Sequence, residues 1–510
     1  MAVNASLAVV AILSSSYAIH ILRKRQKHLP PGPASYPIVG QLLSAPLSAE
    51  HIGYRCLSAE LKSDIICLEF MGNTIIVLHS AQSASDLFEK CSAIYSDRTQ
   101  STMVAHEELL NWGSNVPLTR YGERFRAYRR IFNTWLNKNA STAFHERQVF
   151  NSRQLLARLL KYDGQAISFE ELNSELEWLP AASILGATYG YEVTSSDDPL
   201  VKKIKQVGEN LIKSFLPTHF LVNAIPYLMH VPNWMPGTGW KQTAKEWREL
   251  KDSVVEDMYQ WTRTQMVKGT AEPSIIRSIV ESYASTGGEI SGEDEDNVKN
   301  AGISFFEGYL SEYSYDRHTF FVAMLLYPET QRKAQEELDQ IVGSERFPEM
   351  SDLPQLPYLN NLLQELFRWQ PVLPLGVPHT CSEDNSYGGY FIPKGAIVIG
   401  NVWAMSRDPN VYGNPDPSVP PAPAFGWGRR KCPGVHYAES LLGVTIASIL
   451  LNFDISCVKD EQGRDQAPSA SSADTLVYRP DPFSCLITPR SEQHRHLVSE
   501  IPSQIPFAHS

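Results

Sequence analysis

The pattern of apolar and polar positions predicts a large, mainly helical protein with a small β part. From about Glu123 onward, apolar residues recur mostly at helical spacing. The stretch 65–78 differs, because it carries two short runs rich in β-branched residues on either side of Gly72-Asn73. Two such runs around a turn dipeptide are typical of a β-hairpin. We therefore expect a hairpin near the N-terminus and helices over most of the remaining chain.

A long central helix with an acidic start and an apolar body is predicted. Residues 293–296 are all Glu or Asp, and an apolar pattern at helical spacing follows over 301–326. Acidic side chains at a helix start complement the helix dipole. A further helix is predicted from Pro328 to about Val342, because proline suits the first helical turn and Gly343 follows the expected end.

The N-terminal segment resembles a membrane anchor. Residues 2–22 contain no Asp, Glu, Lys or Arg, and a helix of that length spans roughly 31 Å, enough to cross a bilayer. A cleaved signal peptide carries its positive charge before the apolar run, whereas here the charge follows it. We therefore expect one spanning helix with the rest of the chain cytosolic. Asn4, His20 and several serines dilute the run, so a cleaved signal remains the alternative.

Prolines separate this segment from the main body of the protein. Pro30, Pro31, Pro33 and Pro37 forbid continuation of a helix through this region. The expected organisation is an anchor (2–22), a basic and proline-rich hinge (23–40), one globular domain (41–490) and a tail (491–510).

A second proline-rich stretch, 217–240, is too interrupted for one helix and unusually apolar for an exposed loop. It contains Trp234 and Trp240. Contact with a membrane and burial in the core are both open interpretations of its apolar character.

The composition indicates a globular protein with reduced thiols and argues against nucleic acid as a partner. With 510 residues, of which 43% are apolar and 20% charged, the chain has ample material for a large core. Its net charge of −11 and the lack of zinc-finger spacing speak against nucleic acid as a partner. The seven cysteines include no C-x-x-C pair, which indicates reduced thiols in a cytosol-like compartment.

The most specific pattern is the segment 425–434, Phe-Gly-Trp-Gly-Arg-Arg-Lys-Cys-Pro-Gly, followed by an apolar helical run over 435–451. Basic neighbours and a helix N-terminus both favour the thiolate of Cys432, the form that binds iron. Gly428 and Gly434 let backbone amides approach the sulfur, and the arginines can pair with the carboxylates of a haem. A buried structural cysteine in a glycine-rich turn is the alternative.

This segment resembles the haem signature of the cytochrome P-450 family, F-x-x-G-x-R-x-C-x-G. All five fixed positions match: Phe425, Gly428, Arg430, Cys432 and Gly434. The resemblance covers roughly residues 29–490. It implies the mainly helical P-450 fold plus one N-terminal transmembrane helix, and makes 41–490 the haem-thiolate catalytic domain. It also implies haem b as cofactor, Cys432 as the axial iron ligand, and Phe425, Arg430 and Gly434 as parts of the haem-binding segment.

Residues 365–368 resemble the family's E-x-x-R pair. Glu365 and Arg368 stand three positions apart on a predicted helix, where a carboxylate and a guanidinium can meet. The resemblance implies a buried structural pair, and an ordinary exposed helix pair is the alternative.

The segment around Arg129 resembles the W-x-x-x-R helix that borders the haem in the family, which implies Arg129 as a propionate partner. Phe125 stands at the tryptophan position, so an indole donor is lost while ring packing can remain. Arg126 and Arg130 face either an electron donor or solvent. His379 stands where the family often supplies another propionate contact, against the alternative of an ordinary loop histidine.

The central helix departs from the family pattern A/G-G-x-D/E-T/S. Residues 307–313 read Glu-Gly-Tyr-Leu-Ser-Glu-Tyr, which places Ser311 at the acid position and Glu312 at the alcohol position. In the family, these two groups supply protons during dioxygen activation. Either Glu312 donates from a shifted position, or it faces a helix neighbour or water while Tyr309 and Tyr313 crowd the pocket.

A second departure is the short segment between Pro417 and Pro423, where the family has a longer one that includes a P-x-R-F element. The arginine of that element normally completes the network of the E-x-x-R pair, and no replacement stands between Arg407 and Arg429. A buried pair without its third partner loses roughly several kcal/mol. A skipped exon in the gene prediction and a real deletion both explain the loss.

Carried to activity, the resemblance implies a monooxygenase that takes electrons from NADPH through a flavoprotein reductase and inserts one oxygen atom into an apolar small-molecule substrate. Residues 401–409 and 231–237 look like fungal members of the family similar to O-methylsterigmatocystin oxidoreductase. Secondary metabolite biosynthesis at the endoplasmic reticulum membrane, single-pass with a cytosolic catalytic domain, is then the implied setting. The loops near 100–118, 207–220 and 473–477 are the expected substrate contacts.

Two alternative functions follow from the two departures. A haem-thiolate isomerase or dehydratase needs no dioxygen and tolerates an altered central helix. A catalytically inactive product is the other alternative, because the shortened segment removes part of the expected scaffold.

Overall fold

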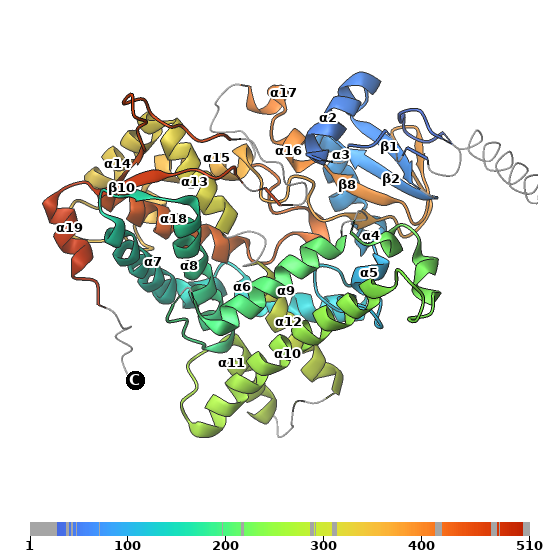
Figure 1. Cartoon of the computed structure of the whole chain (residues 1–510), viewed down its shortest axis with the longest axis horizontal. Helices are drawn as coiled ribbons and strands as arrows, with labels where there is room; N and C mark the ends of the chain where they lie inside the picture. Colours follow the sequence, from blue (N-terminus) through green and yellow to red (C-terminus); the bar gives the residue numbers. More distant parts are fainter. Residues whose placement is uncertain are drawn as a thin grey trace, which may run out of the picture. The chain divides into compact units, whose positions relative to one another are not determined.

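The computed structural model describes residues 28–502, apart from short segments within that range. The segments left undescribed are 37–39, 42–43, 47, 71, 196, 216–218, 286–289, 291, 309–313, 414–420, 471–476 and 479. The predicted anchor (2–22) and part of the predicted hinge and tail therefore lie outside the described residues. The described part is mainly helical with small sheets, as the sequence predicts (Figure 1).

The chain divides into two compact units. The first takes residues up to Thr99, Ala224–Pro226 and Pro374–Lys431, and the second takes Gln100–Asn223, Tyr227–Leu373 and everything from Cys432 onward. The boundary between Lys431 and Cys432 falls inside the haem-signature segment, so each unit carries part of it.

The first unit is built on a sheet with strand order β1-β2-β8-β5-β3. Its strands are β1 (Ile65–Phe70), β2 (Asn73–Leu78), β8 (Ile397–Gly400), β5 (His379–Thr380) and β3 (Asp97–Arg98). The antiparallel pairing of β1 with β2 confirms the predicted hairpin, and Gly72 adopts a φ of 90° in its turn. β8 then joins β2 in parallel, with Ile75 opposite Ile397.

Short helices and one small hairpin complete the first unit. They are α2 (Glu50–Leu61), α3 (Ala81–Ser85), η1 (Asp86–Lys90), α4 (Ser92–Tyr95), β6 (Asn385–Tyr387), β7 (Tyr390–Ile392), α16 (Val402–Met405), α17 (Pro409–Tyr412) and η8 (Gly428–Arg430). The core beneath the sheet includes Leu78, Phe88, Val398 and Trp427. Because Phe88 lies on η1 and its ring is 5.3 Å from that of Trp427, this core holds η1 against the start of the haem-signature segment.

The second unit is a helical body. Its main helices are α5 (Thr102–Ala105), α6 (Glu123–Leu136), α7 (His145–Leu159), α8 (Phe169–Tyr189), α9 (Pro199–Phe215), α10 (Gly239–Lys268), α11 (Ile275–Ser285), α12 (Gly292–Gly308), α13 (Ser314–Leu326), α14 (Pro328–Ile341), α15 (Pro357–Trp369), α18 (Val435–Asn452) and α19 (Glu492–Ser499). Short helical turns lie between them: η2 (Ala140–Phe144), η3 (Leu160–Tyr162), η4 (Leu221–Asn223), η5 (Pro226–His230) and η7 (Leu353–Gln355).

Helix α18 forms the centre of this body. It packs against α7, α14 and α15, and every residue from Leu441 to Asn452 is buried, as expected of a core helix. Among the described residues it is the one helix long and apolar enough to cross a membrane, but 78% of it is buried inside the protein. It is therefore a core helix.

The predicted helices appear with small shifts. Helix α14 confirms the helix predicted from Pro328, and Gly343 lies just beyond it with a φ of 78°. The central pattern predicted over 301–326 corresponds to α12 and α13. Residues 309–313 lie outside the described part, so the continuity of a single long helix stays a prediction.

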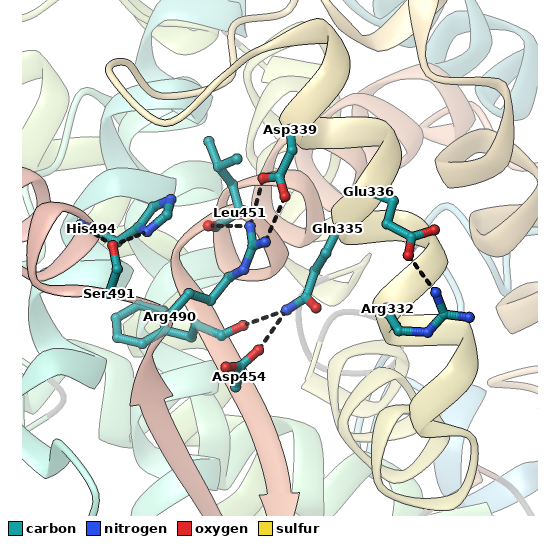
Figure 2. Close-up of polar contacts among 10 residues, drawn as sticks. Arg332, Gln335, Glu336, Asp339, Leu451, Asp454, Arg490, Ser491 and His494 are labelled. Atoms are coloured by element: carbon teal, nitrogen blue, oxygen red, sulfur yellow. Dashed lines mark hydrogen bonds and ion pairs between the residues drawn. The ribbon is translucent and has the colours of Figure 1, made fainter.

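A three-stranded sheet, β4-β10-β9, lies at one edge of the second unit. Its strands are β4 (Ala166–Ile167), β9 (Phe453–Cys457) and β10 (Cys485–Pro489). Helix α14 fixes this sheet through polar contacts, which Figure 2 shows. Gln335 donates to the Phe453 carbonyl (3.2 Å) and to Asp454 (2.9 Å), and Arg490 forms a two-pronged pair with Asp339 at 2.7 and 2.8 Å.

The stretch 217–240 divides into buried and exposed residues. Phe220 and Val222 are buried, whereas Tyr227 is 83% and Trp234 82% exposed. Burial in the core is therefore wrong for Tyr227 and Trp234, because the turns that carry them leave their rings in solvent. Membrane contact by these two rings stays a prediction.

Candidate functional site

Cys432 lies in the second unit, three residues before α18 begins. Its thiol is half-buried and is not part of a disulfide. Gly434 caps the helix, and a Cβ added there would lie 3.7 Å from the Cys432 sulfur. The sulfur thus lies beside the first backbone turn of α18, where the positive end of the helix dipole favours a thiolate.

Arg129, on α6, lies within electrostatic reach of Cys432. Burial lowers the pKa of the Arg129 guanidinium, and the negative charge of Cys432 acts in the opposite direction. On the same helix Phe125 is 4% exposed, with its ring 5.7 Å from that of Tyr121. Ring packing is therefore present at the position where the family has tryptophan.

The outer face of α6 carries Arg126 and Arg130, and both are exposed. Arg126 forms an ion pair with Glu123 on the same helix. Both arginines are thus available to solvent or to a partner.

In the first unit, Gly428 has a steric role that the sequence interpretation missed. It adopts a φ of 52°, and a Cβ at this position would lie 2.2 Å from the carbonyl oxygen of Phe88. Only glycine permits η8 to approach η1 this closely. Two residues later, Arg430 donates a hydrogen bond of 2.8 Å from Nε to the carbonyl of Ser96.

Arg98 joins Arg430 in this part of the site. Its Nη1 donates to the carbonyls of Val377 (2.6 Å) and Pro378 (2.9 Å), and the residue is 7% exposed. Burial and then the positive charge of Arg430 lower the pKa of Arg98, whereas Asp97 acts in the opposite direction. Sequence reasoning missed Arg98, because no local pattern marks it before β3 pairs with β5.

His379 lies directly opposite Arg98 in that pairing. It is a buried strand residue, so the alternative of an ordinary loop histidine is wrong. Its Nδ1 lies 2.6 Å from the Tyr95 carbonyl, and its ring stacks on Phe88 at 4.2 Å. Burial and the nearby guanidinium of Arg98 lower its pKa well below the ordinary range. With a proton on Nδ1 for the carbonyl, the neutral ring has no second N–H for a propionate, so Arg98 is the better donor.

The residues of each unit, taken separately, suit a haem. In the first unit, the neighbouring guanidiniums of buried Arg98 and half-buried Arg430 favour bound carboxylates, and a haem carries two propionates. A thiolate at Cys432 is a soft anionic ligand that suits iron, and Arg129 adds a further cation on the side of Cys432.

The E-x-x-R pair forms, but the expectation that it is buried is wrong. Arg368 donates to Glu365 at 2.5 and 2.6 Å on α15. The Glu365 side chain is nevertheless 54% exposed, against 23% for Arg368. The described neighbours cover the arginine more than the carboxylate.

Several predicted features lie outside the described residues. Ser311 and Glu312 are among them, and so is most of the shortened segment between Pro417 and Pro423. A groove of about 460 Å³ in the second unit coincides with the loop expected near 100–118. Its lining is largely polar, which does not suit an apolar substrate: Gln100, Ala105, His106, Glu107, Asn111, Gly113, Ser114, Thr119 and Arg120.

Comparison with known proteins decides the family. The sequence profile described as Cytochrome P450 matches residues 30–486. The chain belongs to the cytochrome P450 family. As a member it is an oxidoreductase of the cytochrome P450 monooxygenase type with a haem prosthetic group, which confirms the resemblance inferred from the signature.

Relatives from several fungi match almost end to end. The chain is 33% identical to a cytochrome P450 monooxygenase of Armillaria gallica over 98% of this chain and 99% of the relative. It is 36% identical to Cytochrome P450 monooxygenase 208 of Postia placenta, with 96% of both chains covered. It is 34% identical to Cytochrome P450 monooxygenase ple1 of Rhodocybe pseudopiperita, covering 97% and 96%. The similarity therefore extends well beyond the haem-signature segment.

Proposed function

We propose that this cytochrome P450 inserts one oxygen atom from dioxygen into an apolar small molecule in fungal secondary metabolism. The observation that carries the proposal is the proximity of Arg430 to buried Arg98. The two guanidiniums provide a site that would bind a carboxylate, and Arg430 stands two residues before Cys432 in the sequence. The haem-thiolate group, when bound, supplies the chemistry that activates dioxygen. The described residues would hold that group, and we assign the proton supply to Ser311 and Glu312 on sequence alone.

Each named residue has a separate part in the proposal. Cys432 would ligate the haem iron through its sulfur, and Gly434 keeps the adjoining turn free of a side chain. Arg430 and Arg98 of the first unit would pair with haem propionates, and Arg129 of the second unit is proposed as a further propionate partner. His379 lies opposite Arg98 in the pairing of β5 with β3, and its contact with the Tyr95 carbonyl would help to position Arg98.

The proposal includes the partners that such chemistry requires. Electrons come from NADPH through a flavoprotein reductase, and exposed Arg126 and Arg130 on α6 suit an acidic electron donor. The segment 2–22 anchors the protein in the endoplasmic reticulum membrane with domain 41–490 in the cytosol, which the basic residues after 22 support.

The test is the carbon monoxide difference spectrum of the reduced full-length protein. We expect a red-shifted Soret band of the thiolate type in the wild type and its loss in Cys432→Ser. Cys56→Ser is the matched control, because Cys56 is an exposed thiol, and this variant should keep the band. A wild-type protein that takes up haem without the thiolate band contradicts the assignment of Cys432.

A second measurement separates oxygen insertion from the isomerase or dehydratase alternative. Turnover that stops without NADPH or dioxygen supports the monooxygenase, whereas turnover that needs neither supports a rearrangement. Complete failure to retain haem under all conditions supports the inactive product, which the shortened segment near Pro417 also suggests.

A further inference from the structure

Cys457 and Cys485 form a cysteine pair that the haem site does not use. They lie directly opposite each other on the antiparallel strands β9 and β10 of the second unit. Both are free thiols. Cross-strand partners share one face of a sheet, so the two side chains point to the same side.

The backbone hydrogen bonds show which class of cross-strand pair this is. Ile455, two residues before Cys457, bonds to Gln331 of α14 through both its N–H (2.8 Å) and its carbonyl (2.9 Å). Its backbone groups therefore point away from β10. The alternation of an antiparallel ladder has a period of two residues, so Cys457 and Cys485 also occupy a non-hydrogen-bonded position.

That position brings the two sulfurs within bonding reach. Directly opposite residues of this class have Cα atoms about 4.5 Å apart. A disulfide needs a Cα separation of about 4.4–6.8 Å. The pair therefore fits a disulfide without a shift of either strand.

The register of the two strands is firmly held, which keeps the thiols opposite each other. Gln335 binds the Phe453 carbonyl and Asp454 on β9, while Arg490 at the end of β10 binds Asp339 (Figure 2). Both anchors lie on α14. A slip of one residue would break these contacts and turn the inward face outward.

The two thiols differ in access. Cys485 is fully buried, whereas Cys457 is half-buried, with its sulfur 3.8 Å from the Leu325 carbonyl on α13. A small oxidant in solvent reaches Cys457 first. Burial raises the pKa of both thiols, to about 12 for Cys485. Because the thiolate is the reactive form, the pair reacts slowly and stays reduced unless an oxidant is present for a long time.

We propose that Cys457 and Cys485 are a modification site that a peroxide converts into an intramolecular disulfide. The Cys457 sulfur, deprotonated, attacks one peroxide oxygen, the O–O bond breaks, and the displaced hydroxide takes up a proton to leave as water. The Cys485 sulfur then attacks the resulting sulfenic acid, the S–O bond breaks, and a second water leaves with the Cys485 proton. Two thiols lose two electrons and two protons, and one peroxide becomes two waters.

Oxidation has two structural consequences. The disulfide closes the base of the segment 458–484, which includes the expected substrate loop near 473–477. It also removes the S–H donor of Cys457, so the contact from β9 to the Leu325 carbonyl on α13 is lost.

The experiment uses the full-length, haem-loaded protein exposed to hydrogen peroxide in mildly alkaline buffer. Remaining thiols are blocked, the protein is digested, and the peptides are analysed by mass spectrometry. We expect a peptide carrying Cys457 joined to one carrying Cys485, and reversal by dithiothreitol. Cys67 is the internal control, because it is a strand cysteine that faces Ile76 instead of a second thiol and should remain reduced.

A variant of Cys485 provides a second test of the disulfide. Cys485→Ser should give no joined peptide and a dimedone-labelled Cys457, because the sulfenic acid then lacks its resolving thiol. The wild-type measurement stands even if this variant folds poorly. Oxidation of exposed Cys56 in the wild type with no Cys457–Cys485 link overturns the proposal.

Discussion

The guanidinium of Arg430 lies close enough to the buried guanidinium of Arg98 to lower the pKa of Arg98. Arg98 is fixed on the carbonyls of Val377 and Pro378, and Arg430 on that of Ser96. A buried cation and a neighbouring cation repel each other unless an anion lies between or beside them. A bound carboxylate would therefore stabilise the arrangement of these two guanidiniums.

Replacing Arg98 should weaken haem retention. Arg98→Gln keeps a polar side chain but removes the charge, so we expect the haem-to-protein absorbance ratio after purification to fall several-fold. Arg126→Gln is the control, because that arginine is exposed and forms an ion pair with Glu123 on the same helix. An Arg98→Gln protein with the wild-type ratio would falsify the propionate assignment.

Local sequence patterns predicted those elements that depend on neighbours along the chain. The hairpin 65–78 needed only two runs rich in β-branched residues around Gly72-Asn73, and α14 needed only Pro328 and Gly343 at its ends. The prediction for Cys432 rests on equally local information, because the signature places its glycines and arginines within ten residues.

Features that depend on distant pairing were not predictable in this way. Arg98 becomes part of the site only when β3 pairs with β5, which lies far along the chain. The exposure of Glu365 was also missed, since spacing on a helix fixes the partner, Arg368, but not what covers the pair. Burial is a property of packing, and a helical repeat does not encode it.

The close approach of η8 to η1 predicts unequal effects of two neighbouring glycine substitutions. Gly426 and Gly428 both have positive φ, but an added Cβ meets nothing at Gly426 and meets the Phe88 carbonyl at Gly428. Gly426→Ala should cost roughly 1–2 kcal/mol from left-handed strain alone. Gly428→Ala should cost roughly 1–3 kcal/mol more, because the overlap forces a backbone shift. Urea unfolding of the two variants compares them, and equal midpoints contradict the clash.

The exposure of Glu365 predicts a small energetic role for the E-x-x-R pair. An exposed ion pair contributes only about 0–1 kcal/mol, whereas breaking a buried one costs about 3–5 kcal/mol. We expect Glu365→Gln to shift the free energy of unfolding by about 1 kcal/mol or less. A double-mutant cycle with Arg368→Gln measures the coupling directly. A coupling of several kcal/mol would show that the carboxylate is covered in the protein in solution.

The contact between α14 and β10 predicts a defined dependence of stability on pH. The hydrogen bond from Arg490 lowers the pKa of Asp339, more than burial raises it. Because the folded pKa lies below the unfolded value of about 3.9, the pair contributes stability above that pH and loses it as the pH falls through the folded pKa. The Asp339 side chain is 43% exposed, so solvent screening limits the contribution to about 1 kcal/mol.

Asp339→Asn should therefore lower the urea midpoint at pH about 7, and the difference from wild type should shrink between pH about 5 and about 3. Glu336→Gln is the matched control, because Glu336 lies on the same helix and pairs with Arg332 at the exposed surface (Figure 2). That variant should change the midpoint little at either pH. If the Asp339→Asn difference stays constant down to pH about 3, the ionised carboxylate is not what stabilises the contact between α14 and β10.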